Sequence, residues 1–287
     1  MSHSAQNLET IFSAPFWETV WDHLGNTFLA DHQKRYPQRW SQFYENHGPL
    51  LREIGGVDHG EGCFVIEALL RQGMSFQGST VVDLGCGSGW LALPLVLKGA
   101  RVLAVDTSTR MLETLRNRAQ AMGIASLKTL EASWTEIKSR EPFDLVLAAS
   151  FPPALCPDGI SRMERLGKKC ILLLPGSSQG LPWIKSLWST LCDRNPFSGS
   201  LQLRAALNYL MAVGREPNLI QVRIPMAVDL PLDQVIDFYA GYFALFERCD
   251  PEVREIIQRE IAPFTHEGRV HARGESHFGL IWWVPMP

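Results

Sequence analysis

The sequence predicts an α/β fold in which a doubly wound, mostly parallel, seven-stranded sheet carries helices on both faces and follows an N-terminal helical cap. Three observations lead to this prediction. Short apolar runs alternate with amphipathic segments between residues 79 and 175. A loop with glycines at positions 85, 87 and 89 joins the first of these runs to a helical pattern. The first 77 residues contain only helical patterns, and these are rich in aromatic side chains.

Residues 1–77 form the predicted cap, which we interpret as a segment that covers a substrate. Apolar side chains at helical spacing, separated by glycine turns, predict helices over residues 9–30, 37–54 and 62–73. An aromatic stripe at this spacing is more typical of packed core, and we assign Trp17 and Trp21 to the core. For Trp40 and Tyr44, which lie one helical turn apart, packing in the core and contact with a ligand both stay open.

Residues 78–287 form the predicted sheet domain. Its first five strands are predicted at Ser79–Leu84, Arg101–Asp106, Leu127–Glu131, Phe143–Ala149 and Cys170–Leu174. The helices predicted between the first three strands are Trp90–Lys98 and Thr109–Met122. Strands that alternate with helices in this way pair in parallel through right-handed crossovers.

Residues 176–287 form the C-terminal half of this domain, with helical insertions and the last two strands. The predicted helices are Leu181–Cys192, Leu201–Val213, Leu232–Phe246 and Pro251–Ile261, and the predicted strands are Leu219–Val228 and His277–Val284. We find no internal repeat and no segment of low complexity.

The composition is that of an ordinary globular protein, with 46% apolar and 20% charged residues. A formal net charge of -3 disfavours a nucleic-acid partner, because such proteins carry basic surfaces. The six cysteines form no C-x-x-C pair, which argues against a zinc knuckle and for free thiols in a reducing compartment. No secretory signal or membrane-spanning run is visible, so we expect a cytoplasmic protein, either a monomer or a homodimer.

Two acidic residues flank the glycine loop. Asp83 lies two residues before Gly85, and Asp106 ends the next predicted strand, about twenty residues beyond the loop. Glycines at alternate positions let the backbone turn sharply and approach a ligand closely, and an acid at the end of the second strand can accept hydrogen bonds from ribose hydroxyls. The pattern therefore predicts a cofactor that contains a nucleoside.

The loop distinguishes between two classes of cofactor. A dinucleotide site needs the pattern G-x-G-x-x-G, whereas this chain has G-x-G-x-G followed by the bulky Trp90. Residues 81–90 instead resemble the first motif of the class I, Rossmann-like methyltransferases, which use S-adenosyl-L-methionine and release S-adenosyl-L-homocysteine. The resemblance covers residues 79–175. A nicotinamide-dependent oxidoreductase is the disfavoured alternative.

The resemblance also implies which residues contact the cofactor. Asp83 and the loop would hold the methionine moiety, Asp106 the ribose, and Ser133 with Trp134 the adenine. The complete predicted set is Asp83, Gly85, Cys86, Gly87, Gly89, Asp106, Thr107, Met111, Ser133, Trp134, Ser150, Trp40 and Tyr44. Trp134 has the core as an equally open alternative.

The segment Ser150-Phe151-Pro152-Pro153 follows the fourth predicted strand. It departs from the Asn/Asp/Ser-Pro-Pro-aromatic motif of amino-methyltransferases, because Phe151 interrupts the order and no aromatic residue follows the prolines. We interpret the segment as a rigid proline turn that leaves the strand. The histidines, among them His266, His271 and His277, show no metal-ligand spacing, so no metal site is predicted.

The predicted reaction is transfer of the sulfonium methyl group to an O, N, S or C nucleophile on a small-molecule acceptor. Alignment of acceptor, methyl carbon and sulfur would supply much of the rate enhancement, so no catalytic residue is assigned. Two alternatives stay open: aminocarboxypropyl transfer from the same cofactor, and a regulatory module that binds the cofactor without turnover. The aromatic content of the chain favours an apolar or planar acceptor in an enclosed pocket.

Overall fold

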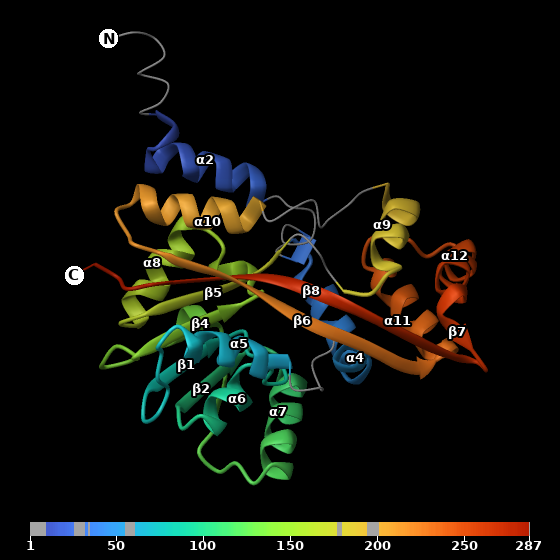
Figure 1. The fold of residues 1–287 in the computed structure, drawn as a ribbon, viewed down its shortest axis with the longest axis horizontal. Helices are drawn as coiled ribbons and strands as arrows, with labels where there is room; N and C mark the ends of the chain where they lie inside the picture. The colour runs from blue at the N-terminus through green and yellow to red at the C-terminus, as the bar shows by residue number, and fades with distance from the viewer. Residues whose placement is uncertain are drawn as a thin grey trace.

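Seven strands, in the order β3-β2-β1-β4-β5-β8-β6, make one sheet through the centre of the computed structural model (Figure 1). The structure describes residues 10–25, 32–33, 35–54, 61–176, 180–193 and 201–286. The strands are β1 (Thr80–Leu84), β2 (Arg101–Asp106), β3 (Lys128–Glu131), β4 (Leu145–Ala149), β5 (Cys170–Pro175), β6 (Asn218–Pro231) and β8 (Arg269–Trp283). The two-residue strand β7 (Thr265–His266) pairs with β8 outside this path.

The strand order confirms the doubly wound topology. Strands β3, β2, β1, β4 and β5 are parallel, and β8 is antiparallel to both β5 and β6. β1 pairs with β2 on one side and with β4 on the other, so the direction of winding reverses beside β1. Ligands of open α/β sheets bind in the crevice at the carboxyl ends of the strands at such a reversal.

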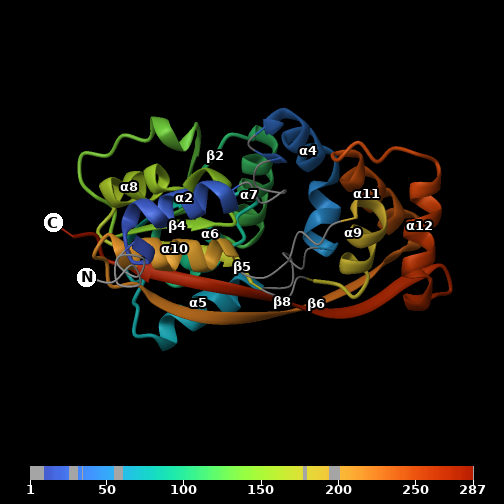
Figure 2. The same ribbon diagram turned by 90° about the horizontal axis from the view of Figure 1, so that it is seen from above.

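Helices cover both faces of the sheet (Figures 1 and 2). On one face the buried side chains of α5 (Glu61–Arg71), α6 (Ala92–Leu97) and α7 (Thr109–Ala121) pack against the sheet in one apolar cluster. On the other face a second cluster joins the sheet to α2 (Ala14–Gly25), α8 (Pro157–Leu166) and α10 (Leu201–Ala212). Trp21 of α2 is buried there, with its ring 5.5 Å from that of Tyr209 on α10.

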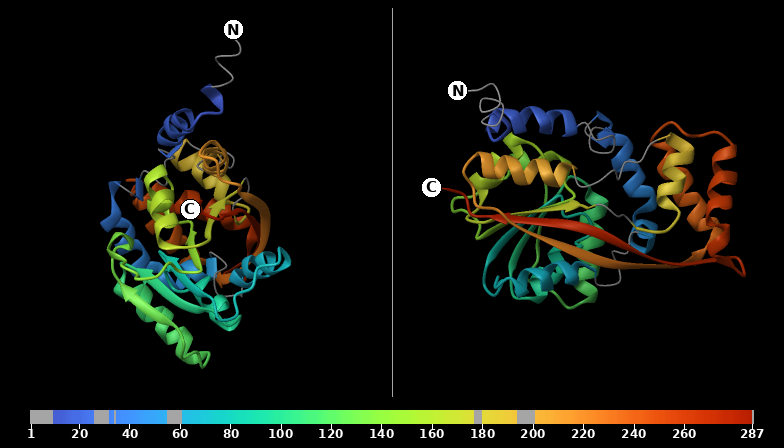
Figure 3. Two further views of the ribbon diagram at one scale, coloured as in Figure 1. Left: turned by 90° about the vertical axis from the view of Figure 1, so that its left-hand side faces the viewer. Right: turned by 45° about the horizontal axis from the view of Figure 1, so that its top comes forward.

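A separate helical unit sits on the far ends of the long β6 and β8 strands (Figures 2 and 3). It consists of α4 (Pro37–Ile54), α9 (Ile184–Cys192), α11 (Leu232–Ala244) and α12 (Glu252–Ile261). These helices share a third apolar cluster with side chains from β6 and β8. One N-terminal helix and three C-terminal helices therefore fold together, whereas α2 packs on α10 and α5 packs on β6.

The structure differs from the sequence predictions in three elements. Helix α8, residues 157–166, was not predicted, because its proline and glycine resemble a turn. Pro157 in fact occupies the first helical turn, where a missing amide is tolerated, and the Cys156 sulfur accepts the Gly159 amide. β6 runs to Pro231, and β8 begins at Arg269, so both are longer than predicted.

Parts of the N-terminal predictions lie outside the described residues. Of the helix predicted over residues 9–30, residues 10–25 are described and contain α2 (Ala14–Gly25), and residues 26–30 lie outside the description. The glycine turn at residues 55–60 also lies outside it. The helix predicted over residues 37–54 is confirmed as α4.

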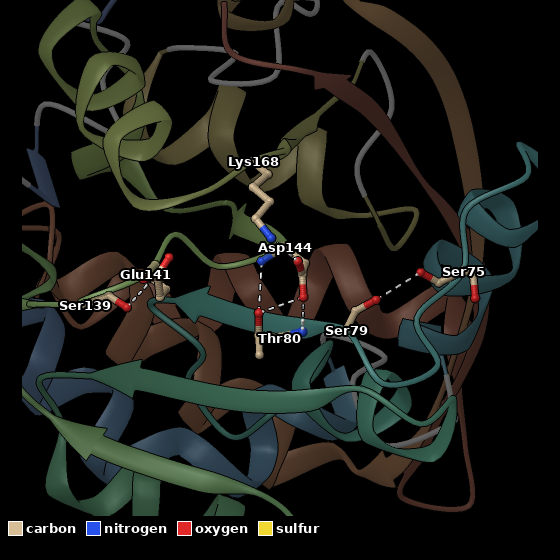
Figure 4. Close-up of polar contacts among 7 residues, drawn as sticks. All are labelled: Ser75, Ser79, Thr80, Ser139, Glu141, Asp144 and Lys168. Carbon is tan, nitrogen blue, oxygen red and sulfur yellow. Dashed lines mark hydrogen bonds and ion pairs between the residues drawn. The ribbon is translucent and has the colours of Figure 1, made fainter. Parts of the chain in front are cut away.

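A polar cluster joins three strands at their amino-terminal ends (Figure 4). Asp144, which precedes β4, accepts hydrogen bonds through Oδ2 from the amide and the hydroxyl of Thr80 at 2.9 and 2.8 Å. Its Oδ1 accepts from Lys168 Nζ at 2.8 Å. The Lys168 hydrogen bond, followed by the Thr80 bonds, holds the pKa of Asp144 well below its usual range. The cluster stabilises the edge of the sheet opposite to the carboxyl ends of the strands.

Candidate functional site

The glycine loop after β1 adopts backbone conformations that side chains disfavour. Gly85, Gly87 and Gly89 have φ values of 67°, 52° and 89°. A Cβ atom at Gly85 would lie 2.3 Å from the Phe151 ring, and one at Gly89 would lie 2.2 Å from the Leu115 side chain. A Cβ at Gly87 would have no neighbour within 4 Å. Close packing therefore explains the outer glycines, whereas the middle glycine turns towards open space.

Asp106, at the end of β2, connects the loop to the next helix. Its Oδ2 accepts a hydrogen bond from the Gly87 amide at 2.9 Å, and its Oδ1 accepts one from the Ser108 amide at 2.9 Å. Ser108 caps α7, because its hydroxyl accepts the Met111 amide at 3.3 Å. The carboxylate thus fixes the loop and the start of α7 relative to one another.

Asp83, near the end of β1, is a buried carboxyl group with a relative exposure of 2%. Burial and then the nearby Asp106 raise the pKa of Asp83 to about 7, although a hydrogen bond from the Ala92 amide opposes this shift. Among the described residues, no hydrogen bond or ion pair joins Asp83 to a cationic side chain. A buried acid of this kind is suited to a ligand that carries positive charge.

The loop and both acids line one cavity with a volume of about 610 Å³, which lies at the carboxyl ends of β1, β2 and β4. Its wall consists of Gln33, Pro37, Trp40, Ser41, Tyr44, Asp83, Gly85, Cys86, Gly87, Ser88, Trp90, Leu91, Asp106, Thr107, Ser108, Met111, Ala149, Ser150, Phe151, Pro152 and Pro153. Pockets of 300–1,000 Å³ with mostly apolar walls are typical of small-molecule sites. The cavity occupies the crevice that the strand order predicts.

Comparisons with known proteins identify this part of the chain. Residues 81–169, which include the loop, both acids and β4, match the family model of a methyltransferase domain. This part of the chain is therefore similar to a methyltransferase domain over residues 81–169. The chain is 37% identical over 91 residues to a ubiquinone biosynthesis O-methyltransferase of Methylocella silvestris, a match that covers 30% of this chain and 34% of that protein.

Two further similar proteins have different descriptions. A ribosomal protein L11 methyltransferase of Klebsiella pneumoniae is 35% identical over 119 residues, which cover 38% of this chain and 39% of that protein. The chain thus spans about a third of the length of the curated relatives it matches. A methyltransferase structure from Thiobacillus denitrificans, crystallised with S-adenosyl-L-homocysteine, has a TM-score of 0.46 and 20% identity over 77% of this chain and 90% of that chain.

Helix α4 closes the cavity of the methyltransferase domain on one side. Trp40 is 6% exposed, and its indole Nε1 donates to His32 Nδ1 at 3.0 Å. Tyr44 accepts a hydrogen bond from Gln33 Nε2 at 2.9 Å, and burial raises the pKa of Tyr44 to about 12. Trp40 and Tyr44 both line the cavity while they pack in the helical unit, so packing in the core is confirmed and contact with a ligand stays a prediction.

The segment after β4 forms the opposite wall. Ser150 has a φ of 47°, a left-handed conformation that is uncommon for serine and is often found at ligand sites. Phe151 lies against Gly85, and its ring centroid is 5.7 Å from that of Trp134 in an edge-to-face contact. Pro152 and Pro153 begin a short 3-10 helix, as the interpretation of a rigid proline turn requires.

Most of the predicted cofactor residues meet in this cavity. Those on its wall are Asp83, Gly85, Cys86, Gly87, Asp106, Thr107, Met111, Ser150, Trp40 and Tyr44. Gly89, Ser133 and Trp134 do not line it: Gly89 packs on Leu115, and Ser133 caps the 3-10 helix Trp134–Glu136. Trp134 contacts the Phe151 ring edge-to-face and does not reach the wall itself. Binding of the cofactor by any of these residues stays a prediction.

The sequence analysis did not assign several wall residues to the site. Pro37 and Ser41 share the cavity-facing side of α4 with Trp40 and Tyr44, so helical periodicity could have found them. Gln33 lies outside any recognised motif, and no sequence signal points to it. Within the described part of the chain, no three His, Cys, Asp or Glu side chains are placed to hold a metal ion. No helix in the described ranges is both long and apolar enough to cross a membrane.

Proposed function

We propose that this chain is an S-adenosyl-L-methionine-dependent methyltransferase that methylates a small-molecule acceptor. The observation that carries the proposal is the convergence of Asp83, Asp106 and the left-handed glycines Gly85 and Gly87 on one cavity beside β1. Such a combination serves a ligand with both a nucleoside and a positive charge. The match of residues 81–169 to a methyltransferase domain supports the same conclusion.

The residues present fit this cofactor. The wall of the cavity at Gly87 is open, so the backbone can approach a ligand closely. Asp106 uses each carboxylate oxygen once for a backbone amide, and each oxygen keeps a lone pair for a ribose hydroxyl. Asp83 would face the cationic part. When bound, the cofactor supplies a methyl group that its sulfonium already activates.

The chain's own residues would align the reactants and exclude water. Trp40 and Tyr44 on α4 face the loop from one side, and Ser150 and Phe151 face it from the β4 side. An acceptor held between these walls would have its translational and rotational freedom removed before the reaction. Burial keeps the Tyr44 hydroxyl and the Cys86 thiol protonated near neutral pH, since it raises the pKa of both groups. We therefore assign neither group as a base.

A small acceptor is favoured by the shape and chemistry of the cavity. Apart from the two acids, its walls consist mostly of aromatic side chains, prolines and small residues. Walls of this kind suit an apolar or planar acceptor. A protein acceptor is the second candidate, because relatives named ribosomal protein L11 methyltransferases match part of this chain. A protein substrate would have to insert one side chain between α4 and the segment after β4.

Calorimetric titration with S-adenosyl-L-homocysteine tests the cofactor assignment. We expect binding by the wild-type chain and a loss of at least tenfold in affinity for Asp83→Ala and Asp106→Ala, since each removes a charged partner. Asp22→Asn, at an exposed position on α2, is the matched control and should bind normally. Unchanged affinity in both cavity variants would refute the assignment.

Product analysis tests the reaction and the acceptor. Incubation with isotopically labelled cofactor, a metabolite mixture and, separately, purified L11 protein distinguishes the two acceptor classes by where the label appears. The mass added to the product separates a methyl group from an aminocarboxypropyl group. Cofactor binding without product in either arm would support the regulatory alternative.

A further inference from the structure

Among the residues that the structure describes, the two carboxyl groups in the cavity have no cationic side chain beside them. Asp83 and Asp106 end adjacent strands and both line the wall, whereas its described residues include no lysine, arginine or histidine. Arg118 of α7 donates to the Ser88 carbonyl at 2.8 Å and is not part of the wall. His32 accepts the Trp40 indole hydrogen and also lies off the wall. The charge of the cavity is therefore set by the two acids and by whatever binds.

The two acids are not equivalent. Asp106 receives two backbone hydrogen bonds, from the Gly87 and Ser108 amides. Asp83 is 2% exposed and receives one, from the Ala92 amide. When two acids share an enclosed site, the repulsion between them chiefly raises the pKa of the acid that receives fewer hydrogen bonds. Asp83 is thus the group whose charge a ligand can change.

The donor and the product of the proposed reaction differ by one charge. The sulfonium of S-adenosyl-L-methionine is positive, and the thioether of S-adenosyl-L-homocysteine is neutral, while the rest of the two molecules is the same. A positive charge brought into a cavity with two carboxyl groups favours the ionised form of both. A neutral sulfur has no such effect.

We propose that Asp83, acting with Asp106, makes the cavity select the cationic sulfonium donor over its neutral thioether product. The inference rests on the proposed function, since it assumes that both molecules occupy this cavity. The donor binds with Asp83 ionised, and one proton leaves the site. Loss of the sulfonium charge during methyl transfer removes that stabilisation, Asp83 takes up a proton again, and the product is released more readily.

Among the described residues, Cys86 in the loop interacts with Asp83, and Tyr44 on α4 interacts with Asp106. Burial raises the pKa of both groups and keeps them neutral in the relevant range. With the pKa of Asp83 near 7 in the empty site, about one-tenth of the molecules are ionised at pH 6 and half at pH 7. The affinity for the cation should therefore rise about fivefold between these two pH values.

Calorimetric titrations at pH 6 and pH 7 test the inference with three probes: S-adenosyl-L-methionine, S-adenosyl-L-homocysteine and sinefungin, in which an ammonium group replaces the sulfonium. We expect the Kd ratio of product to donor to rise about fivefold from pH 6 to pH 7, and sinefungin to follow the donor. At pH 6, buffers of different ionisation enthalpy should report release of about one proton with either cation and less with the product.

Asp83→Asn removes the titration and keeps the shape of the side chain. In this variant the Kd ratio should become independent of pH and fall below the wild-type ratio at pH 7, and Asp22→Asn should behave as wild type. Protonation of the ligands themselves is common to all variants and cancels in the comparison. If Asp83→Asn does not fold, the inference is still tested by the pH dependence of the Kd ratio and by the proton release of the wild-type chain.

Equal pH dependence for donor and product in the wild type would overturn the inference, and so would a ratio that Asp83→Asn leaves unchanged. Failure of the proposed function has a different result, because none of the three probes would then bind the wild-type chain at either pH.

Discussion

The Asp106 carboxylate accepts a hydrogen bond from the Gly87 amide at 2.9 Å, so the end of β2 holds the middle of the loop that follows β1. The same side chain accepts from Ser108 at the start of α7. One acidic residue thereby organises two backbone segments on the wall of the cavity. The carboxylate that we propose binds the ribose therefore also positions the glycine loop and the start of α7.

The first prediction separates these two roles of Asp106. Asp106→Asn keeps one oxygen acceptor but removes the second, so either the Gly87 or the Ser108 amide loses its partner. We expect the affinity for S-adenosyl-L-homocysteine to fall ten- to hundredfold, as for the loss of a hydrogen bond to a charged group. Calorimetry measures this. A drop in affinity of less than threefold would contradict the role given to the carboxylate.

The second prediction concerns Gly85. Gly85→Ala should destabilise the fold by about 2–4 kcal/mol, because alanine is strained at a φ of 67° and its Cβ would overlap the Phe151 ring. The double variant Gly85→Ala/Phe151→Ala should show favourable coupling, since removal of the ring relieves the overlap. Urea denaturation of the ligand-free protein gives the four free energies of the cycle.

Gly87→Ala is the matched control for this cycle. Its φ of 52° is also left-handed, but no atom lies within 4 Å of the added Cβ. We expect a cost of about 1–2 kcal/mol, from backbone strain alone, and no coupling to Phe151→Ala. Coupling of similar size at both glycines would mean that the contact between Gly85 and Phe151 is not what distinguishes them.

The third prediction tests a partly buried ion pair between α8 and the segment after α10. Glu164 accepts from Arg215 Nε at 2.7 Å and Nη2 at 2.8 Å, and from the Trp283 indole at 2.8 Å. Burial alone would raise the pKa of Glu164, but the hydrogen bonds from Arg215 and Trp283 outweigh it and lower the pKa. Glu164→Gln should cost about 1–3 kcal/mol of folding free energy, measured by urea denaturation.

Glu164 lies on α8 and is not on the wall of the cavity beside β1. Affinity for S-adenosyl-L-homocysteine should therefore be unchanged in Glu164→Gln wherever the variant is folded. Loss of ligand affinity in a folded sample would show that the ion pair influences the cavity.

The fourth prediction is a pH dependence of stability that arises from Asp144. Its pKa in the folded chain is below the value in the unfolded chain, so the unfolded state binds more protons in acid. The stabilisation is present above the unfolded pKa of about 4 and declines as the pH falls below that value. Asp144→Asn should lower Tm modestly at pH 7, and the difference from wild type should shrink below pH 4.

Lys168→Met removes the first cause of the Asp144 shift while Thr80 still donates its two hydrogen bonds. Its effect on Tm should be smaller than that of Asp144→Asn, because Lys168 is largely exposed to solvent. If the difference in Tm between the wild type and Asp144→Asn stays constant from pH 7 to pH 3, Asp144 is not the source of the pH dependence.

The loop and its two acids could be predicted from the sequence because the signals are local. Apolar runs before Gly85 and Asp106 define the strands, and the glycine spacing defines the turn between them. The structure confirms the predicted strands and the doubly wound topology. Local patterns alone do not show that Trp40 and Tyr44, about forty residues before the loop, reach the same cavity; the resemblance to known methyltransferases led to that prediction.

The missed elements depend on contacts that are distant in sequence. Residues 269–276 of β8 contain charged and polar side chains, but Val270 and Ala272 alternate with them and are buried against the helical unit. The alternation indicates a strand only once the partner strand β6 is known, since Leu230 pairs with Val270 and Val228 pairs with Ala272. Gln33 could not be predicted, because its place on the wall depends on how the chain before α4 folds back onto Tyr44.

The position of β8 also has a consequence for synthesis of the chain. β8 is the last strand in the sequence, yet it lies between β5 and β6, with Leu280 opposite Leu173 on one side and opposite Ile220 on the other. Until residues 269–283 leave the ribosome, β5 keeps an open, apolar edge and β6 lacks its described partner in the sheet. Nascent chains that stall before residue 269 should therefore be the forms that most need a chaperone.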